Sequence, residues 1–279
     1  MLTQQQVASY TELGYLVLES MIEGAELELL RSSALETIDE FNALQQGSVF
    51  SAREGEEMRE EYFFESAEKV RCFLEADAVG PEGNLTRPKH ECINKIGHAL
   101  HDLLPAFTRF CRQPAFAQLL DELGCHEPEL WQTMYILKPP RVGGEVRWHQ
   151  DASYLITHPA SVIGIWVAID DATRDNGCLW VQPGGHRSPL REVFEAGVSS
   201  GRSRLRQLND TPWPTLDASK SLEVGAGSVV VFHDHLPHYS SHNHSARPRH
   251  AFSMHAKAAA ARWSERNWLQ RKTLQPFRL

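Results

Sequence analysis

The sequence predicts a mainly β protein, an antiparallel sandwich or barrel with helices packed outside it. Two observations carry this prediction. Apolar residues in the first part of the chain keep helical spacing, whereas after Glu129 the chain becomes a series of short apolar strands separated by turn residues. No repeat or break in composition divides the 279 residues. We therefore expect a single domain, residues 1–279, with a helical part at about 1–125 and a β core at about 126–260.

The first helix is predicted at residues 3–13. Thr3 is a suitable N-terminal cap, and Gly14 ends the helical pattern. A short apolar strand at 15–18 follows directly. The chain therefore opens with a helix that leads into a strand.

Two longer stretches also keep helical apolar spacing. Residues 24–46 keep it until Gly47 ends the run, and residues 93–123 keep it with interruptions at Pro105 and Pro114. Between them lies a charge-rich segment at 51–61, which we expect to be a solvated loop or helix face.

The second half of the chain is predicted to be strands joined by tight turns. Asn176-Gly177 and Gly184-Gly185 are strong turn dipeptides. The run at 162–169 is apolar almost throughout, which is typical of a strand buried on both faces. The predicted strands are residues 131–137, 162–169, 178–181, 228–232 and 250–255.

Composition excludes several functional classes. The net charge of −8 argues against a nucleic-acid-binding protein and against a polybasic membrane anchor, since both need clustered Lys and Arg. No apolar run reaches the length of a membrane span, and a secretory signal is not expected. The five cysteines are scattered, with no Cys-x-x-Cys, so a reducing, cytoplasmic location fits best.

The pair His149 and Asp151 is a candidate for half of a metal site. Successive strand residues alternate between faces, so these two side chains are expected on the same side of a strand. Two histidines and one carboxylate with open positions form the facial triad of non-haem Fe(II) oxygenases. On spacing alone the third ligand is open among His233, His235 and His238, and a zinc hydrolase site or an inert site on a cupin-like fold also remains open.

Arg249 strengthens the oxygenase interpretation. It precedes the strand predicted at 250–255, and its guanidinium can present a two-pronged set of donors to a carboxylate. An oxygenase that uses 2-oxoglutarate needs a charged anchor for the carboxylate that does not chelate the metal. Without such a context, Arg249 would be interpreted as a surface arginine.

These features extend into a resemblance that covers nearly the whole chain. The sequence resembles the phytanoyl-CoA dioxygenase family of Fe(II)/2-oxoglutarate oxygenases. The motifs that carry the resemblance are ELGYLVL at 12–18, INKIGHALH at 93–101, MYILK at 134–138, GGEV at 143–146, HQDAS at 149–153, DNGCLW at 175–180 and NWLQ at 267–270.

The resemblance implies a double-stranded β-helix (a cupin-like jelly roll) with iron bound by His149, Asp151 and His238. In the family pattern a serine follows the distal histidine by two residues and an arginine follows it by eleven, and among the three candidates His238 fits. Ser240 and Arg249 would then hold the distal carboxylate of 2-oxoglutarate. The matching cosubstrate positions are Lys95, Met134 and Trp166, of which Met134 and Trp166 would otherwise be interpreted as core.

The implied reaction is hydroxylation with O₂, coupled to conversion of 2-oxoglutarate into succinate and CO₂. The retained carboxylate Asp151 favours hydroxylation over halogenation. The substrate is expected to be a small organic molecule or an acyl-CoA-like compound. His98 and His101 are possible substrate-side groups, although structural roles are the alternative. A zinc-type hydrolase or isomerase, and a binding module without turnover, are the competing hypotheses.

Overall fold

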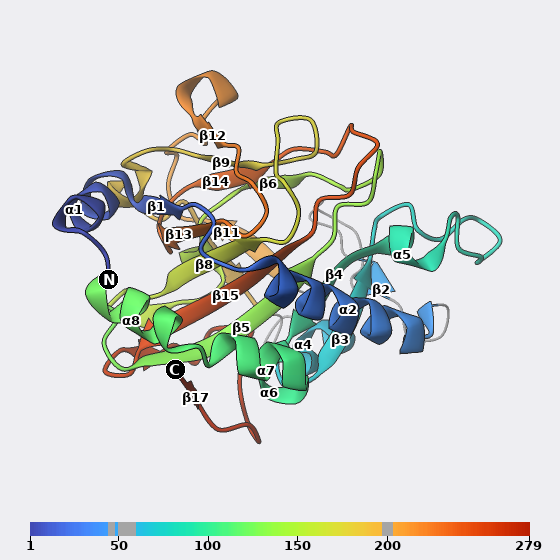
Figure 1. Cartoon of the computed structure of the whole chain (residues 1–279), viewed down its shortest axis with the longest axis horizontal. Helices are drawn as coiled ribbons and strands as arrows, with labels where there is room; N and C mark the ends of the chain where they lie inside the picture. Colours follow the sequence, from blue (N-terminus) through green and yellow to red (C-terminus); the bar gives the residue numbers. More distant parts are fainter. Residues whose placement is uncertain (44–47, 50–59, 197–202) are drawn as a thin grey trace.

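The computed structural model describes residues 1–43, 48–49, 60–196 and 203–279. Two sheets, antiparallel apart from one parallel pair at the edge of the larger one, lie face to face, and helices cover the outer face of the larger sheet (Figure 1). In order of pairing, the large sheet contains β1 (Tyr15–Leu18), β13 (Val229–His233), β8 (Ile163–Ala168), β15 (Ala251–Ala258), β5 (Pro128–Ile136), β4 (Ile93–His98), β3 (Val70–Leu74) and β2 (Ser48–Val49), with β17 (Phe277–Arg278) also paired to β5.

The small sheet lies across the inner face of the large one. It contains β12 (Lys220–Leu222), β9 (Leu179–Val181), β14 (His238–Ser240) and β6 (Val146–His149), in that order. Two further strand pairs are β10 (Glu192–Glu195) with β11 (Arg204–Gln207), and β7 (Thr157–His158) with β16 (Arg262–Trp263). Trp166 and Val230 of the large sheet pack against Leu179 and Val181 of the small sheet, which joins the two layers.

The helices are short apart from α2. They are α1 (Gln4–Leu13), α2 (Gly24–Glu40), α4 (Glu60–Glu65), α5 (Lys89–Cys92), α6 (Leu100–Leu103), α7 (Pro105–Cys111) and α8 (Pro114–Glu122), and short 3₁₀ turns lie at Asp151–Ser153, Gly185–Arg187 and Leu216–Ala218. The buried face of α2, including Leu30 and Ile38, packs with Phe107 of α7 against the outer face of the large sheet. The rings of Phe107 and Phe252 lie 5.0 Å apart there.

This arrangement confirms the predicted fold class. The chain is mainly β, with helices outside two facing sheets, and the sheets form a double-stranded β-helix, or jelly roll. Strand β8 is buried at every position, as its continuous apolar run predicted. The predicted strands are present with bounds shifted by up to three residues.

The N-terminal helix is also confirmed. The side chain of Thr3 accepts a hydrogen bond from the backbone N–H of Gln6, and the Gln6 side chain accepts one from the backbone N–H of Thr3. Gly14 ends the helix with a φ of 81°, a conformation that glycine adopts without strain.

The helical prediction for residues 93–123 is wrong at its start. Residues Ile93–His98 form strand β4, which pairs with β3 and β5 in the middle of the large sheet. Ile93 and Ile96 have helical spacing, but the strand is buried on both of its faces, and a short buried run cannot be told from a helix by its period. Pro105 and Pro114 do not interrupt one helix. They lie in the first turns of α7 and α8, where a backbone N–H has no partner within the helix and its absence in proline costs nothing.

Some expectations lie outside the described residues. These are residues 44–47 of the predicted second helix and most of the charge-rich segment at 51–61. The helix predicted over 24–46 is too long, because α2 already ends at Glu40 and Phe41 has an extended backbone. Within the described ranges, no helix combines the length and apolar character needed to cross a membrane.

Candidate active site

A cavity of about 200 Å³ lies between the two sheets. Its lining comes from both layers and includes every residue that the sequence analysis assigned to metal or cosubstrate. These residues are Lys95, Met134, His149, Asp151, Trp166, His238, Ser240 and Arg249. Residues separated by more than 150 positions in the sequence thus meet around one space.

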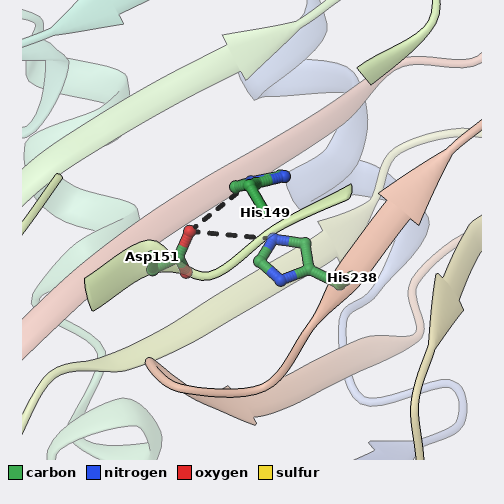
Figure 2. A group of neighbouring side chains, drawn as sticks. All are labelled: His149, Asp151 and His238. Atoms are coloured by element: carbon green, nitrogen blue, oxygen red, sulfur yellow. Dashed lines mark ion pairs between the residues drawn. The ribbon is translucent and has the colours of Figure 1, made fainter. Parts of the chain in front are cut away.

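His149, Asp151 and His238 all line the cavity and form a compact group. Figure 2 shows both histidines beside the Asp151 carboxylate. His149 ends β6 and His238 begins β14, and the two residues are direct cross-strand partners in the small sheet. Nε2 of each histidine lies 3.7 Å from Oδ1 of Asp151. One ligand atom from each of the three residues lies within 4.8 Å of the others, which is close enough to hold a single ion.

Asp151 lies just beyond the strand that carries His149. It is not on a strand with His149 but opens the 3₁₀ turn Asp151–Ser153, directly after β6 ends. The backbone carbonyl of Asp151 accepts hydrogen bonds from the N–H groups of Tyr154 and Leu155, which hold the turn. Gln150, between the two, still has an extended backbone with φ −121° and ψ 133°, so the side chains of His149 and Asp151 project to the same side as alternation predicts.

Hydrogen bonds fix the tautomer of both histidines. Nδ1 of His149 lies 2.9 Å from the carbonyl oxygen of Arg147, and Nδ1 of His238 lies 2.9 Å from that of Leu236. A carbonyl can only accept, so Nδ1 carries the hydrogen in each ring. The Nε2 lone pairs are then left to face the carboxylate, as in metal-ligating histidines.

The site's electrostatics keep His149 and Asp151 in their ligating forms at neutral pH. Burial, reinforced by the neighbouring His238, lowers the pKa of His149 to about 3, so its ring is neutral. Burial alone would raise the pKa of Asp151, but the surrounding histidines, with His255 foremost, bring it below its usual range. Neutral imidazoles and an ionised carboxylate are what a divalent cation requires.

Arg249 lies within the same cavity and is almost completely buried, with 1% of its surface exposed. Its Nη2 donates to Ser240 Oγ at 3.4 Å, and its guanidinium carbon lies 5.5 Å from the centre of the Trp166 ring. Nε and Nη1 are buried and have no partner among the described residues. Burial lowers the pKa of Arg249 to about 10, so the group is still a cation at neutral pH.

The other predicted cosubstrate residues sit on neighbouring strands of the large sheet. Lys95 of β4 is 9% exposed, and burial lowers its pKa to about 7. Met134 of β5 lies opposite Gly97 of β4, where the absence of a side chain leaves it room. Ser240 Oγ donates to the carbonyl of Gly177 at 2.8 Å, which leaves its lone pairs directed toward Arg249.

The residues present fit both a metal ion and an anionic cosubstrate. Two imidazoles and one carboxylate form an open three-ligand set, which matches Fe(II) oxygenases better than a closed structural zinc site. A buried guanidinium without a counter-charge is costly unless an anion completes it. A molecule with a carboxylate at each end, bound between the three candidate ligands and Arg249, would bind the metal at one end and pair with the guanidinium at the other.

Comparisons with known proteins agree with this geometry. The sequence model described as phytanoyl-CoA dioxygenase (PhyH) matches residues 10–251. The chain is 39% identical over 273 residues to a phytanoyl-CoA dioxygenase of Arabidopsis thaliana, covering 97% of this chain and 94% of that one. It is 36% identical to phytanoyl-CoA dioxygenase domain-containing protein 1 of Mus musculus, covering 99% of this chain and 97% of that one.

The chain belongs to the phytanoyl-CoA dioxygenase family. It is therefore a 2-oxoglutarate-dependent dioxygenase.

Solved structures agree with the fold of this dioxygenase. EctD from S. alaskensis, solved with 2-oxoglutarate and 5-hydroxyectoine, superposes with a TM-score of 0.64 at 19% identity, covering 95% of this chain and 79% of that one. The α-ketoglutarate-dependent carbocyclase SnoK from nogalamycin biosynthesis superposes with a TM-score of 0.63 at 17% identity, covering 94% and 86%. At this level of identity the likeness concerns the fold.

The remaining histidines of the dioxygenase separate into distinct environments. His98 lines the cavity, with Nδ1 2.7 Å from Ser66 Oγ. His101 is fully buried outside the described cavity lining, where it contacts Thr133 and Arg271. The histidines near the distal ligand are not in the metal-capable group found among the described residues; these are His233, His235, His242 and His244.

Sequence reasoning missed several residues of the dioxygenase cavity. His255 on β15 contacts Asp151, and Phe63 and Trp268 stack at 4.1 Å in the cavity wall. His255 could have been found from strand alternation, because it is six residues after Arg249 and an extended segment places both side chains on the same side. The pairing of Phe63 with Trp268 joins distant segments and leaves no pattern in the sequence.

Proposed function

We propose that this chain is an Fe(II)-dependent hydroxylase that uses 2-oxoglutarate and O₂ and releases succinate and CO₂. In this proposal His149, Asp151 and His238 bind the iron. Arg249 and Ser240 bind the distal carboxylate of 2-oxoglutarate, and Lys95, Met134 and Trp166 line its site. The family match over 10–251 supports one catalytic domain spanning the chain.

Arg249 is the observation that carries the proposal. A zinc hydrolase or isomerase on the same fold needs the metal ligands but has no use for a buried arginine with unpaired donors. Within the described residues, Nε and Nη1 of Arg249 have no partner, and burial makes an unpaired cation unfavourable. A bound dicarboxylate supplies the missing charge and two acceptor oxygens.

The iron, when bound, supplies activation of O₂ and removal of a hydrogen atom from the substrate. The chain's own residues supply position and shielding. The Nδ1 hydrogen bonds of His149 and His238 direct their Nε2 atoms, and Arg249 fixes the far end of the cosubstrate. The stacked rings of Phe63 and Trp268 close one side of the cavity against water.

The substrate we propose is a small organic molecule or the acyl end of a CoA-like thioester. The plant relative named a phytanoyl-CoA dioxygenase supports the second alternative. The small volume of the cavity, about 200 Å³, supports a substrate of which only the reacting part enters it. We also propose a cytoplasmic location, which is supported by five free, buried cysteines.

The test is succinate formation by the purified protein with Fe(II), 2-oxoglutarate and O₂. We expect slow turnover without primary substrate, and we expect Asp151→Ala and His238→Ala to abolish it. His235→Ala is the matched control, because this neighbouring histidine is outside the ligand group. Succinate formation that survives both ligand substitutions, or turnover with Zn²⁺ that ignores 2-oxoglutarate, would refute the proposal.

A further inference from the structure

The Oδ2 atom of Asp151, which does not face His149 and His238, has a histidine neighbour of its own. Nε2 of His255, on β15, lies 3.1 Å from Oδ2 of Asp151. Oδ1 of the same carboxylate lies 3.7 Å from Nε2 of both His149 and His238. The two oxygens therefore have different partners, one from the large sheet and two from the small sheet.

We propose that His255 is a positioning residue that holds Oδ2 of Asp151, so that Oδ1 alone is presented to the metal. This inference rests on the proposed function, because it assumes that Asp151 is a metal ligand. It assigns a role to a residue that lies outside the ligand group and outside the predicted cosubstrate contacts.

The hydrogen bond has a defined direction. An ionised carboxylate can only accept, so Nε2 of His255 carries the hydrogen and donates it. Nδ1 of His255 is buried and has no partner among the described residues. The bond to Asp151 is therefore the contact that orients this ring, and replacing the ring disturbs no other side-chain hydrogen bond in the described part of the chain.

The backbone places His255 firmly. Strand β15 lies between β5 and β8, and His255 pairs with Gln132 on one side and Gly164 on the other. The ring is 4% exposed and lines the cavity. From this position on β15 the ring reaches the turn that carries Asp151.

A role for His255 as a fourth ligand does not fit the geometry. The metal-capable group among the described residues contains His149, Asp151 and His238 and not His255. His255 approaches the carboxylate from the oxygen that faces away from the other two histidines. It is therefore a neighbour of a ligand and not itself a ligand.

Holding Oδ2 of Asp151 would change how many metal positions this carboxylate occupies. A carboxylate free to rotate can offer both oxygens to a metal and occupy an additional position. A carboxylate held through Oδ2 offers one, which leaves more positions for the cosubstrate and O₂. Partners of this kind typically change metal affinity by roughly 10–100-fold when they are removed.

The experiment compares substitutions at His255 in the full-length, metal-free protein, titrated with Co²⁺ and followed by visible absorption. Gln carries its amide nitrogen at about the reach of Nε2, whereas the shorter Asn does not reach Asp151. We expect His255→Asn and His255→Phe to weaken Co²⁺ binding by roughly 10–100-fold and to change the ligand-field bands. We expect His255→Gln to stay within about threefold of wild type.

His98→Phe is the matched control, since His98 is a buried histidine of the same cavity that contacts Ser66 and not Asp151. Its Co²⁺ affinity should equal that of wild type. Thermal unfolding without metal checks that each variant is folded. If His255→Phe does not fold, the comparison of His255→Gln with His255→Asn still tests the proposal, because these two variants differ by one methylene group.

Equal Co²⁺ affinity and equal spectra for His255→Gln, His255→Asn and wild type would overturn the positioning role. Asp151→Ala separates this result from failure of the proposed function. If Asp151→Ala binds Co²⁺ as tightly as wild type, the ligand assignment itself is wrong. If it loses Co²⁺ while the His255 variants do not, only the role of His255 is wrong.

Discussion

Replacing Arg249 with leucine should change cosubstrate binding and protein stability in opposite directions. The guanidinium is buried in the cavity with Nε and Nη1 unpaired among the described residues. In the proposed function these two donors bind the distal carboxylate of 2-oxoglutarate. Without the cosubstrate, the same group is a buried cation that lacks a counter-charge, and its removal relieves an unfavourable burial.

The expected loss of 2-oxoglutarate affinity follows from the two donors, Nε and Nη1 of Arg249. A hydrogen bond to a charged group contributes about 1.5–3 kcal/mol, so losing two weakens binding by about 3 kcal/mol at the lower bound. This corresponds to about a 150-fold increase in Kd. At a 2-oxoglutarate concentration about 100 times the wild-type Kd, binding stabilises the wild type by about 2.7 kcal/mol and the variant by about 0.3 kcal/mol.

Calorimetric titration of 2-oxoglutarate measures the affinity, and denaturant unfolding with and without 2-oxoglutarate measures the stability. Both use protein loaded with a redox-inert divalent metal. We expect Arg249→Leu to be at least as stable as wild type without 2-oxoglutarate. Arg147→Gln is the matched control, because Arg147 lines the same cavity but donates to Glu192 at 2.6 Å. Its affinity for 2-oxoglutarate should change by less than about threefold.

Two results would refute this reasoning. If Arg249→Leu binds 2-oxoglutarate within about fivefold of wild type, the free donors do not hold the carboxylate. If the ligand-free variant is instead several kcal/mol less stable, the guanidinium contributes to the fold rather than to the ligand.

Two further predictions concern the large sheet. The pKa of Lys95 falls from 10.5 to about 7 on folding, so between these pH values the unfolded state binds more protons and stability should rise with pH. Lys95→Met should flatten this rise, measured by urea unfolding of the metal-free protein at pH 7 and pH 10, and an unchanged slope would contradict it. A Cβ at Gly164 would lie 2.5 Å from the ring of Phe232, which itself contacts His238. Gly164→Ala should therefore destabilise the protein by about 1–3 kcal/mol and weaken Co²⁺ binding; a variant with wild-type unfolding and wild-type Co²⁺ affinity would show that Phe232 moves aside freely.

The fold was predictable where local patterns are strong. The capping residues of α1 and the continuous apolar run of β8 are local features, and both are present. The sequence predicts a helix at β4 because this short run is buried on both faces and shows no period of two, and only its pairing with β3 and β5 identifies it as a strand. The short strands of the small sheet hold three or four residues each, too few for a period to show.

The candidate site was predictable only in part from the residues themselves. Spacing pairs His149 with Asp151 but does not choose a partner among three later histidines, and family resemblance was needed to select His238. The structure explains the choice, because His238 is the direct cross-strand partner of His149, whereas His233 ends β13 in the large sheet. Sequence distance carries no information about which of two sheets a residue joins.

Sequence patterns miss the contact between His255 and Asp151 because His255 belongs to the large sheet and Asp151 follows a strand of the small one. The small sheet and the turn after it supply the three candidate ligands, and the large sheet supplies His255. A contact between sheets depends on how the layers stack, which neither strand alternation nor motif spacing encodes. Arg249 lies two residues before β15 and exchanges backbone hydrogen bonds with Lys138, so alternation along this segment places Arg249 and His255 on the same side. The segment would therefore bind the cosubstrate at one end and hold a metal ligand at the other. Shifting β15 by one residue would remove both groups from the cavity at once, and its pairing on both sides by β5 and β8 prevents such a shift.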